Sequence, residues 1–179
     1  MKSEQLRINP ARLMKRLDTL AALGATADGS CCRLALTDED KAGRDLVVGW
    51  MRELGLEVRI DPVGNIFGLR RGLESVDACP PVMTGSHIDT VRTGGRYDGN
   101  LGVLGGLEVA QTLNDAGVTT RRPLVVGVFT DEEGARFHPD MAGSLAYVGG
   151  MPLEELYATQ GIDGKVFKDE LARIGASPR

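Results

Sequence analysis

The sequence lacks a surplus of basic residues, a long apolar run and a signal-peptide pattern. Its formal net charge is −4, so no basic stripe is present that could neutralise the phosphates of a nucleic acid. No stretch approaches the ~20 apolar residues that cross a bilayer. The first twenty residues contain neither the apolar segment nor the small-residue cleavage site of a secretory signal. We therefore expect neither nucleic acid nor membrane as a partner.

Cysteine is also scarce. There are three cysteines, an odd number, and Cys31 and Cys32 are adjacent. A disulfide framework and a CxxC zinc knuckle both need other spacings. We interpret the cysteines as reduced and the protein as cytoplasmic. A length of 179 residues with 42% hydrophobic and 26% charged residues fits one soluble globular domain or a large part of one.

The first 55 residues predict two helices. Apolar residues recur at helical spacing from Pro10 to about Leu23. Thr37 would cap a second helix, with Asp40 offering a weak capping box, and Gly55 would end it. We expect the buried face of this second helix to carry residues spaced by four: Leu46, Trp50 and Leu54.

The rest of the chain predicts strands that alternate with helices. A turn over residues 61–65 separates two strands of a hairpin, Leu56–Ile60 and Ile66–Leu69. A βαβ unit follows, in which the last strand is apolar enough to be central in a sheet. Its elements are Pro81–Ser86, Leu101–Leu113 and Pro123–Thr130, and two further helices are expected near Leu153–Tyr157 and Val166–Ile174. The pattern predicts the α/β class.

The first functional motif is the run GSHIDT, residues 85–90, which directly follows a predicted strand. A histidine at the carboxyl end of a strand projects into the crevice where open α/β sheets bind ligands. Asp89, two residues after His87, can accept the second ring N–H and leave the other nitrogen free for a metal ion. Alone, this pattern fits a structural histidine equally well.

The second motif is the glycine-rich run GGRYDGN, residues 94–100, which leads into the predicted helix. Its glycines let the backbone fold closely around a neighbouring group. Asp98 lies just before the helix, where a helix cap and a ligand are equal alternatives. Three glycines within the helix lack the spacing of a phosphate-binding loop and are expected to bring the helix close to the sheet: Gly102, Gly105 and Gly106.

The third motif is Asp131-Glu132-Glu133-Gly134, at the end of the apolar strand. Successive acids beside a buried strand repel one another and are costly to desolvate. In a regular strand Glu132 and Glu133 would point to opposite faces, and Gly134 permits a break that turns both toward one site. A solvated charge run is the alternative. Such runs rarely follow a strand this apolar, so a metal-associated role is favoured.

Together the three motifs fit a hydrolase with two metal ions. In such a site one carboxylate bridges two zinc ions, further His and carboxylate ligands complete each ion, and a free carboxylate moves protons. The free glutamate takes a proton from the attacking water and later delivers one to the leaving nitrogen. The second histidine, His138 in the segment RFHPD, is interpreted as an incidental loop residue.

The segments GSHIDTVRTGGRYDGNLGVLGGLEV and FTDEEGARF together resemble the amidase/hydantoinase/carbamoylase family, within the dizinc exopeptidase-like hydrolases. That family includes N-carbamoyl-L-amino-acid hydrolases, allantoate amidohydrolases and β-ureidopropionases. The run RLALTDEDKAGRDLVVGWMRELGLEVRIDPVGNIFG also resembles the family's opening region, so the similarity covers nearly the whole chain. It implies an α/β catalytic domain with a mixed sheet flanked by helices, and an inserted smaller domain for dimerisation and closure over the substrate.

The resemblance also implies roles for individual residues. His87 resembles a ligand of one zinc ion, Asp98 the bridging carboxylate, and Glu133 a ligand of the other zinc ion. Glu132 resembles the general base, and Asp89 the partner that holds His87. The implied cofactor is two Zn²⁺ ions per complete site, with Mn²⁺, Co²⁺ or Ni²⁺ as substitutes. The implied substrate is an N-carbamoyl amino acid or a related ureido acid such as allantoate or β-ureidopropionate.

Full members of that family are longer, and each metal ion takes a further histidine from beyond this region. With only His87 and His138 available, we expect residues 1–179 to be a fragment: the amino-terminal part of the dizinc catalytic domain, without its remainder and without the dimerisation and lid domain. A homodimer is expected for the complete protein and not for this chain. Two alternatives stay open, a non-catalytic remnant and an aminoacylase or dipeptidase of the same larger group.

Overall fold

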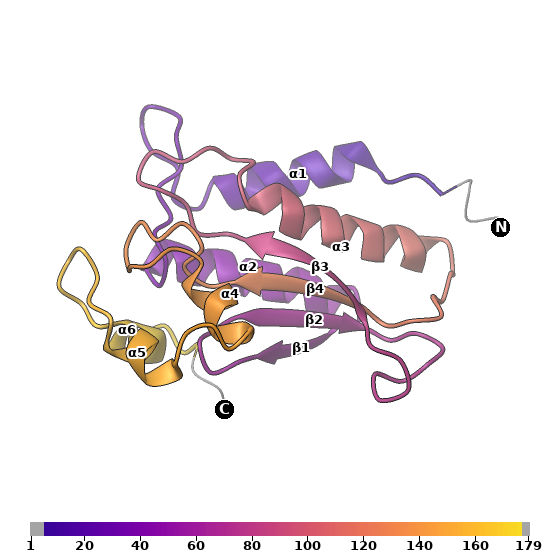
Figure 1. Ribbon diagram of the computed structural model, residues 1–179. Coiled ribbons are helices and arrows are strands. Elements are labelled where there is room, and N and C mark those ends of the chain that lie inside the picture. Colours follow the sequence, from indigo (N-terminus) through magenta and orange to yellow (C-terminus); the bar gives the residue numbers. More distant parts are fainter. Residues whose placement is uncertain (1–5, 177–179) are drawn as a thin grey trace.

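A four-stranded mixed sheet forms the centre of the computed structural model, which describes residues 6–176. Its strands are β1 (Glu57–Ile60), β2 (Ile66–Arg70), β3 (Val82–His87) and β4 (Leu124–Phe129), in the spatial order β1-β2-β4-β3 (Figure 1). β2 pairs antiparallel with both β1 and β4, whereas β3 runs parallel to β4. The predicted hairpin, the predicted parallel pair and the interior place of the apolar strand are confirmed.

Six helices accompany the sheet in the described part of the chain, and α4, α5 and α6 gather at one end of it (Figure 1). Five of the six lie where the sequence predicts them. The prediction missed α4, whose sequence AGSLAY contains glycine and serine, whereas the equally short α5 (LEELYA) is rich in strong helix formers. None of these helices is long and apolar enough to span a membrane. Their bounds are α1 (Pro10–Ala21), α2 (Asp38–Glu53), α3 (Asn100–Asp115), α4 (Ala142–Tyr147), α5 (Leu153–Ala158) and α6 (Phe167–Arg173).

Helices α2 and α3 cover the same face of the sheet. Met51 of α2 packs over Gly68 of β2, and Gly106 of α3 packs against Val126 of β4. Gly68 and Val126 are partners across β2 and β4, so both contacts lie on one face. Gly102 also approaches the sheet as expected, whereas a Cβ atom at Gly105 would meet nothing within 4 Å. The expectation of glycine packing therefore holds for two of the three positions.

The buried face of α2 differs from the predicted one. Leu46, Trp50 and Leu54 are only partly buried against the core, while Val47 and Met51 are fully buried. The predicted face and the observed face of α2 are both apolar. The sheet packs against the face that carries Met51, because Gly68 of β2 leaves room for the Met51 side chain. The ends of α2 lie where predicted, but the capping box at Asp40 does not form, because the Asp40 carboxylate accepts the Leu36 N–H and the Thr37 N–H donates to the backbone oxygen of Leu34. The Thr37 hydroxyl accepts the Asp40 N–H, and Gly55 has a positive φ of 75°.

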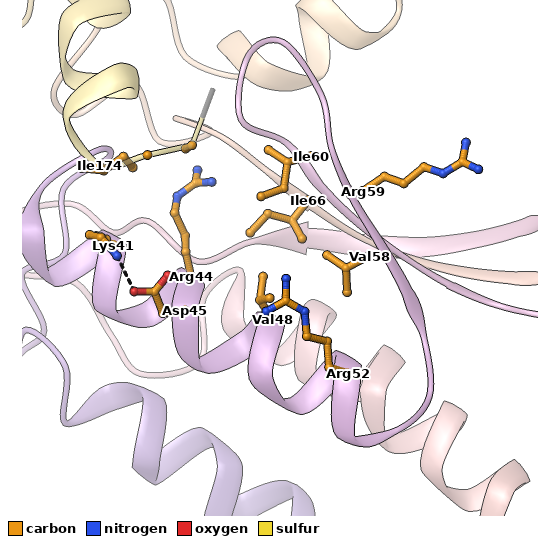
Figure 2. A pocket seen from close by; sticks show the side chains of 12 residues that line it. Lys41, Arg44, Asp45, Val48, Arg52, Val58, Arg59, Ile60, Ile66 and Ile174 are labelled. Atoms are coloured by element: carbon orange, nitrogen blue, oxygen red, sulfur yellow. Dashed lines mark hydrogen bonds and ion pairs between the residues drawn. The ribbon is translucent and has the colours of Figure 1, made fainter. Parts of the chain in front are cut away.

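Two apolar clusters fill the molecule. The larger lies between the sheet and helices α1, α2 and α3, and the smaller joins α4, α5 and α6 to Leu36 and Val63. Arg44, buried beside both, donates to the backbone oxygen of Gly64 and to the hydroxyl of Thr130. A cavity of about 620 Å³ lies next to Arg44, between α2, β1 and the end of α6, and contains none of the predicted site residues (Figure 2).

Glu108 fastens α3 to α1. Its fully buried carboxylate accepts hydrogen bonds from the Asn9 backbone N–H and from the guanidinium of Arg12. Burial alone would raise the pKa of Glu108, but the hydrogen bonds from Arg12 and Asn9 outweigh it and hold the pKa below its ordinary value. Because the folded-state pKa is lowered, this stabilisation is present above the unfolded pKa and is lost as pH falls through the folded pKa.

We expect Glu108→Gln to lower the free energy of unfolding by about 2 kcal/mol at neutral pH, because it removes charge-assisted hydrogen bonds. The difference from the wild type should begin to shrink below about pH 4, where the carboxylate of the unfolded chain takes up a proton, and should vanish at the lower pH where the folded carboxylate is protonated. Urea unfolding at several pH values measures both effects. Asp115→Asn, which removes an exposed contact of the same Arg12, is the control and should cost less than about 1 kcal/mol. A Glu108→Gln effect that is independent of pH would contradict this account.

Candidate active site

His87 is the last residue of β3, at the carboxyl end of the parallel β3–β4 pair. Its side chain is 6% exposed. The Nδ1 atom lies 2.9 Å from the backbone carbonyl oxygen of Asp89, which can only accept a hydrogen bond, so Nδ1 carries the proton. The accepting atom differs from the expected one, because the Asp89 carboxylate is 3.7 Å from Nδ1 and turned elsewhere. In the neutral ring this arrangement leaves the Nε2 lone pair free.

The Asp89 carboxylate binds the acidic loop that follows β4. Its two oxygens accept the backbone N–H groups of Glu132 at 3.3 Å and Glu133 at 3.2 Å. Burial raises the pKa of Asp89 above its usual range, and the nearby charge of Asp40 adds to the rise. His87 and the two backbone N–H groups act in the opposite direction. Asp89 therefore joins the loop after β3 to the loop after β4.

The acidic loop leaves the sheet through two left-handed residues. Strand β4 ends at Phe129, and Asp131 and Gly134 then have φ values of 53° and 61°. A Cβ atom at Gly134 would lie 2.7 Å from the Cα of Asp140, so only glycine fits there. The break expected at Gly134 is present, and Asp131 supplies an earlier one. As a result Glu132 and Glu133 are not held to the opposite faces of a strand.

Three of the predicted site residues, His87, Glu132 and Asp98, come together at this place, and a fourth, Glu133, interacts with them electrostatically. The Nε2 atom of His87 lies 3.3 Å from Glu132 Oε2 and 4.0 Å from Asp98 Oδ1. Burial raises the pKa of Glu133, the negative charges of Asp98 and Glu132 add to the rise, and His87 opposes it. The carboxyl group of Glu133 is thus within electrostatic reach of the other three. The carboxylate of Glu132 lies nearer to His87 Nε2 than the carboxylate of Asp98 does.

This donor set fits a divalent metal ion. A neutral Nε2 atom and carboxylate oxygens are all hydrogen-bond acceptors, and acceptors this close need a proton or a cation between them. Imidazole nitrogen and carboxylate oxygen are zinc ligands. The donor types fit, but the arrangement does not make a complete site: within residues 6–176, no group of three or more His, Cys, Asp or Glu side chains could hold a metal ion. His138 is exposed in the loop after the acidic run.

Asp98 is not the cap of α3. The N-cap is Gly99, with a φ of 63° and no side-chain hydrogen bond, and α3 begins at Asn100. A Cβ atom at Gly99 would lie 2.5 Å from the His87 ring, so the imidazole packs directly against this glycine. The Asp98 side chain is 77% exposed. The helix-cap alternative is therefore wrong, and Asp98 remains beside His87 on the open side of the site.

The sequence analysis assigned no role to Arg33 or to the side chain of Asp131. Arg33 is fully buried behind the His87 loop. Neither carboxylate oxygen of Asp131 has a hydrogen-bond partner of normal geometry. Burial raises the pKa of Asp131 to about 8, the charge of Asp89 adds to the rise, and the Phe137 backbone N–H opposes it. A buried arginine leaves no periodic signal, and the direction of Asp131 depends on its left-handed backbone.

Comparison with known proteins gives consistent matches. Residues 83–170 match the family described as Peptidase family M20/M25/M40. The chain is 46% identical to the N-carbamoyl-L-amino-acid amidohydrolase of Rhizobium meliloti, over 96% of this chain and 41% of that protein. It is 37% identical to the ureidoglycolate hydrolase of Arabidopsis thaliana, over 91% of this chain and 34% of that protein. A hydantoinase/carbamoylase family amidase from Burkholderia ambifaria has a TM-score of 0.94 at 46% identity, over 97% of this chain and 42% of that one.

The mixed sheet and these matches relate the chain to the hydrolases of the M20 group. Within that group, the chain belongs to the hydantoinase/carbamoylase family of amidohydrolases. The α/β fold implied by the sequence resemblance is confirmed. The chain spans about two-fifths of the length of the Rhizobium meliloti amidohydrolase and of the Burkholderia ambifaria amidase.

We expect Gly99→Ala to displace the His87 imidazole, because the new methyl group would overlap the ring and a positive φ costs a non-glycine residue about 1–2 kcal/mol. The chain contains two histidines, so imidazole NMR signals resolve His87 with His138 as an internal reference. Gly95→Ala is the matched control, since a Cβ atom there would meet nothing within 4 Å. Unchanged His87 signals in folded Gly99→Ala would contradict the packing described.

Proposed function

We propose that this chain forms part of the active site of a zinc-dependent amidohydrolase that cleaves C–N bonds of N-carbamoyl amino acids or related ureido acids. The observation that supports the proposal is the approach of His87 Nε2 to the carboxylates of Glu132 and Asp98, from three separate segments of the chain. The printed names of two relatives, an N-carbamoyl-L-amino-acid amidohydrolase and a ureidoglycolate hydrolase, point to carbamoyl and ureido substrates.

His87, Asp98 and Glu133 would hold two zinc ions, with Asp98 as the bridging carboxylate. Bound zinc supplies Lewis acidity and lowers the pKa of water, so that water can act as a nucleophile near neutral pH. Mn²⁺, Co²⁺ and Ni²⁺ accept the same nitrogen and oxygen donors. Asp89 would keep His87 in the tautomer that leaves Nε2 free, through the carbonyl oxygen that accepts the Nδ1 proton.

Glu132 would move the proton. Its side chain is 35% exposed and so reaches the open side of the site, while its backbone N–H is held by Asp89. As general base it takes a proton from the attacking water, and as general acid it delivers a proton to the leaving nitrogen. In this assignment Glu133 would hold metal while Glu132 stays available for protons.

The activity is proposed for the full-length gene product, because this chain corresponds to about two-fifths of its relatives' length. A homodimer of that product, implied by the family resemblance, is part of the proposal. A panel of N-carbamoyl-L-amino acids, allantoate, ureidoglycolate, β-ureidopropionate, N-acetyl amino acids and dipeptides tests the substrate class. Turnover confined to acetyl amino acids or dipeptides would overturn it in favour of an aminoacylase or dipeptidase.

We expect Glu132→Gln in the full-length product to lower turnover by at least about 10²-fold, since a general base typically contributes 10²–10⁴-fold. Its zinc content should stay unchanged, because Glu132 is assigned no coordination bond. Glu133→Gln should instead lose zinc, because an amide oxygen is a poorer zinc ligand than a carboxylate. Zinc stoichiometry and turnover, both measured in both variants, show which glutamate binds zinc and which moves the proton. Zinc loss from Glu132→Gln with full loading of Glu133→Gln would reverse the two roles.

A further inference from the structure

Arg33 is a fully buried arginine with no carboxylate partner among the described residues. Its side chain is 0% exposed. Its guanidinium donates to the backbone oxygens of Ile88, Leu20 and Leu23, to the Cys31 thiol and to the Asn100 side-chain oxygen, and all of these acceptors are neutral. Burying a charge without a counter-charge is costly. Hydrogen bonds to neutral groups, rather than an ion pair, therefore have to stabilise the buried guanidinium of Arg33.

Two of these bonds reach the two loops that carry His87 and Asp98. On one side Nε donates to the carbonyl oxygen of Ile88 at 2.7 Å, directly after His87. On the other side an Nη atom donates at 3.0 Å to Asn100 Oδ1, and Asn100 in turn donates to the backbone oxygen of Arg96 at 3.2 Å. Asp98 lies between Arg96 and Asn100 in the chain. The guanidinium thus bridges the loop after β3 and the loop before α3.

The backbone of Arg33 strengthens the same connection. Its N–H donates to the Thr90 hydroxyl at 2.8 Å, and its carbonyl oxygen accepts the Thr90 N–H at 2.9 Å. Gly43 of α2 lies against the Arg33 side chain, where a Cβ atom would be 3.1 Å from Cδ. Arg33 is therefore anchored to the loop after β3 and also, outside both loops, to Gly43 and to the carbonyl oxygens of Leu20 and Leu23, so it can set the separation of the loops.

We propose that Arg33 is a positioning residue that sets the distance between His87 and Asp98, and through it the metal affinity of the site. The metal part of this inference rests on the proposed function. A planar guanidinium offers five N–H donors in a fixed fork, whereas a lysine ammonium is a single point on a flexible stem. Lysine at position 33 keeps the charge but cannot reach Ile88 and Asn100 together. Arg33→Lys therefore tests the fork rather than the charge.

Hydrogen exchange of backbone amides tests the bridge without any metal. In Arg33→Lys and Arg33→Met we expect the amides of Thr90, Leu101 and Gly102 to exchange at least about tenfold faster than in the wild type. The Glu170 amide in α6 should stay within about twofold, which separates local loosening from general loss of stability. Asn100→Ala leaves Arg33 in place and removes only its link to the Asp98 loop, so it should loosen Leu101 and Gly102. That variant keeps the inference testable if the Arg33 variants do not fold.

Zinc titration of the His87 imidazole NMR signal tests the functional part, with His138 as the internal reference. We expect the apparent Kd at His87 to rise about 10- to 100-fold in Arg33→Lys, the range typical of residues that orient metal ligands. Arg12→Lys is the matched control, because Arg12 joins α1 to α3 away from both loops. It should weaken the fold without changing the zinc midpoint of His87.

The outcomes separate the two claims. Uniform acceleration of exchange across the chain in folded Arg33→Lys, or an equal effect of Arg12→Lys on Thr90, would overturn the positioning role. A wild-type His87 signal that ignores zinc in this chain would overturn the affinity consequence. The zinc content of the full-length product tests the proposed metal function separately, and the exchange arm decides whether Arg33 sets the separation of the loops. An unchanged zinc midpoint in Arg33→Lys, with zinc binding in the wild type, would reject the link between loop separation and metal affinity.

Discussion

The buried carboxylate of Asp89 is the constraint on which the site depends. Its oxygens accept the backbone N–H groups of Glu132 and Glu133, and the carbonyl oxygen of the same residue accepts the Nδ1 proton of His87. Because a buried charge is costly without donors, the loops after β3 and β4 have to stay together for Asp89 to be accommodated. One residue therefore determines where an imidazole and two glutamates lie.

The site is graded from a buried end to an open end. The side chain of His87 is 6% exposed, that of Glu132 is 35% exposed and that of Asp98 is 77% exposed. Electrostatic interactions are strongest where water is excluded. Charges therefore interact most strongly near the buried imidazole of His87, and solvent screens them most near Asp98. A group that approaches from outside meets Asp98 and Glu132 before it meets His87.

Much of this arrangement could be predicted from the sequence, because the signals are local. His87 and the acidic run each follow an apolar strand, and a glycine-rich loop precedes the helix beside Asp98. Details that depend on tertiary geometry could not be predicted from the sequence. The choice between the carbonyl and the carboxylate of Asp89 depends on how a turn is oriented, and the stripe of α2 that the sheet buries depends on Gly68. Helix α4 contains glycine and serine, which are weak helix formers. Arg33 has no pattern of its own, because its hydrogen-bond partners outside its own segment come from residues 20–23, residues 88–90 and Asn100.

The strand order has a consequence for synthesis on the ribosome. Within the described chain, β3 pairs only with β4, and β4 also joins β3 to the β1–β2 hairpin. Chain growth from the amino terminus thus releases His87 about forty residues before the strand that holds it. Until residues 124–129 emerge, the hairpin and β3 are separate pieces with unpaired edges. Of the described strands, β4 is the last to be made, so the edge that carries His87 can assemble only after residues 124–129 have emerged.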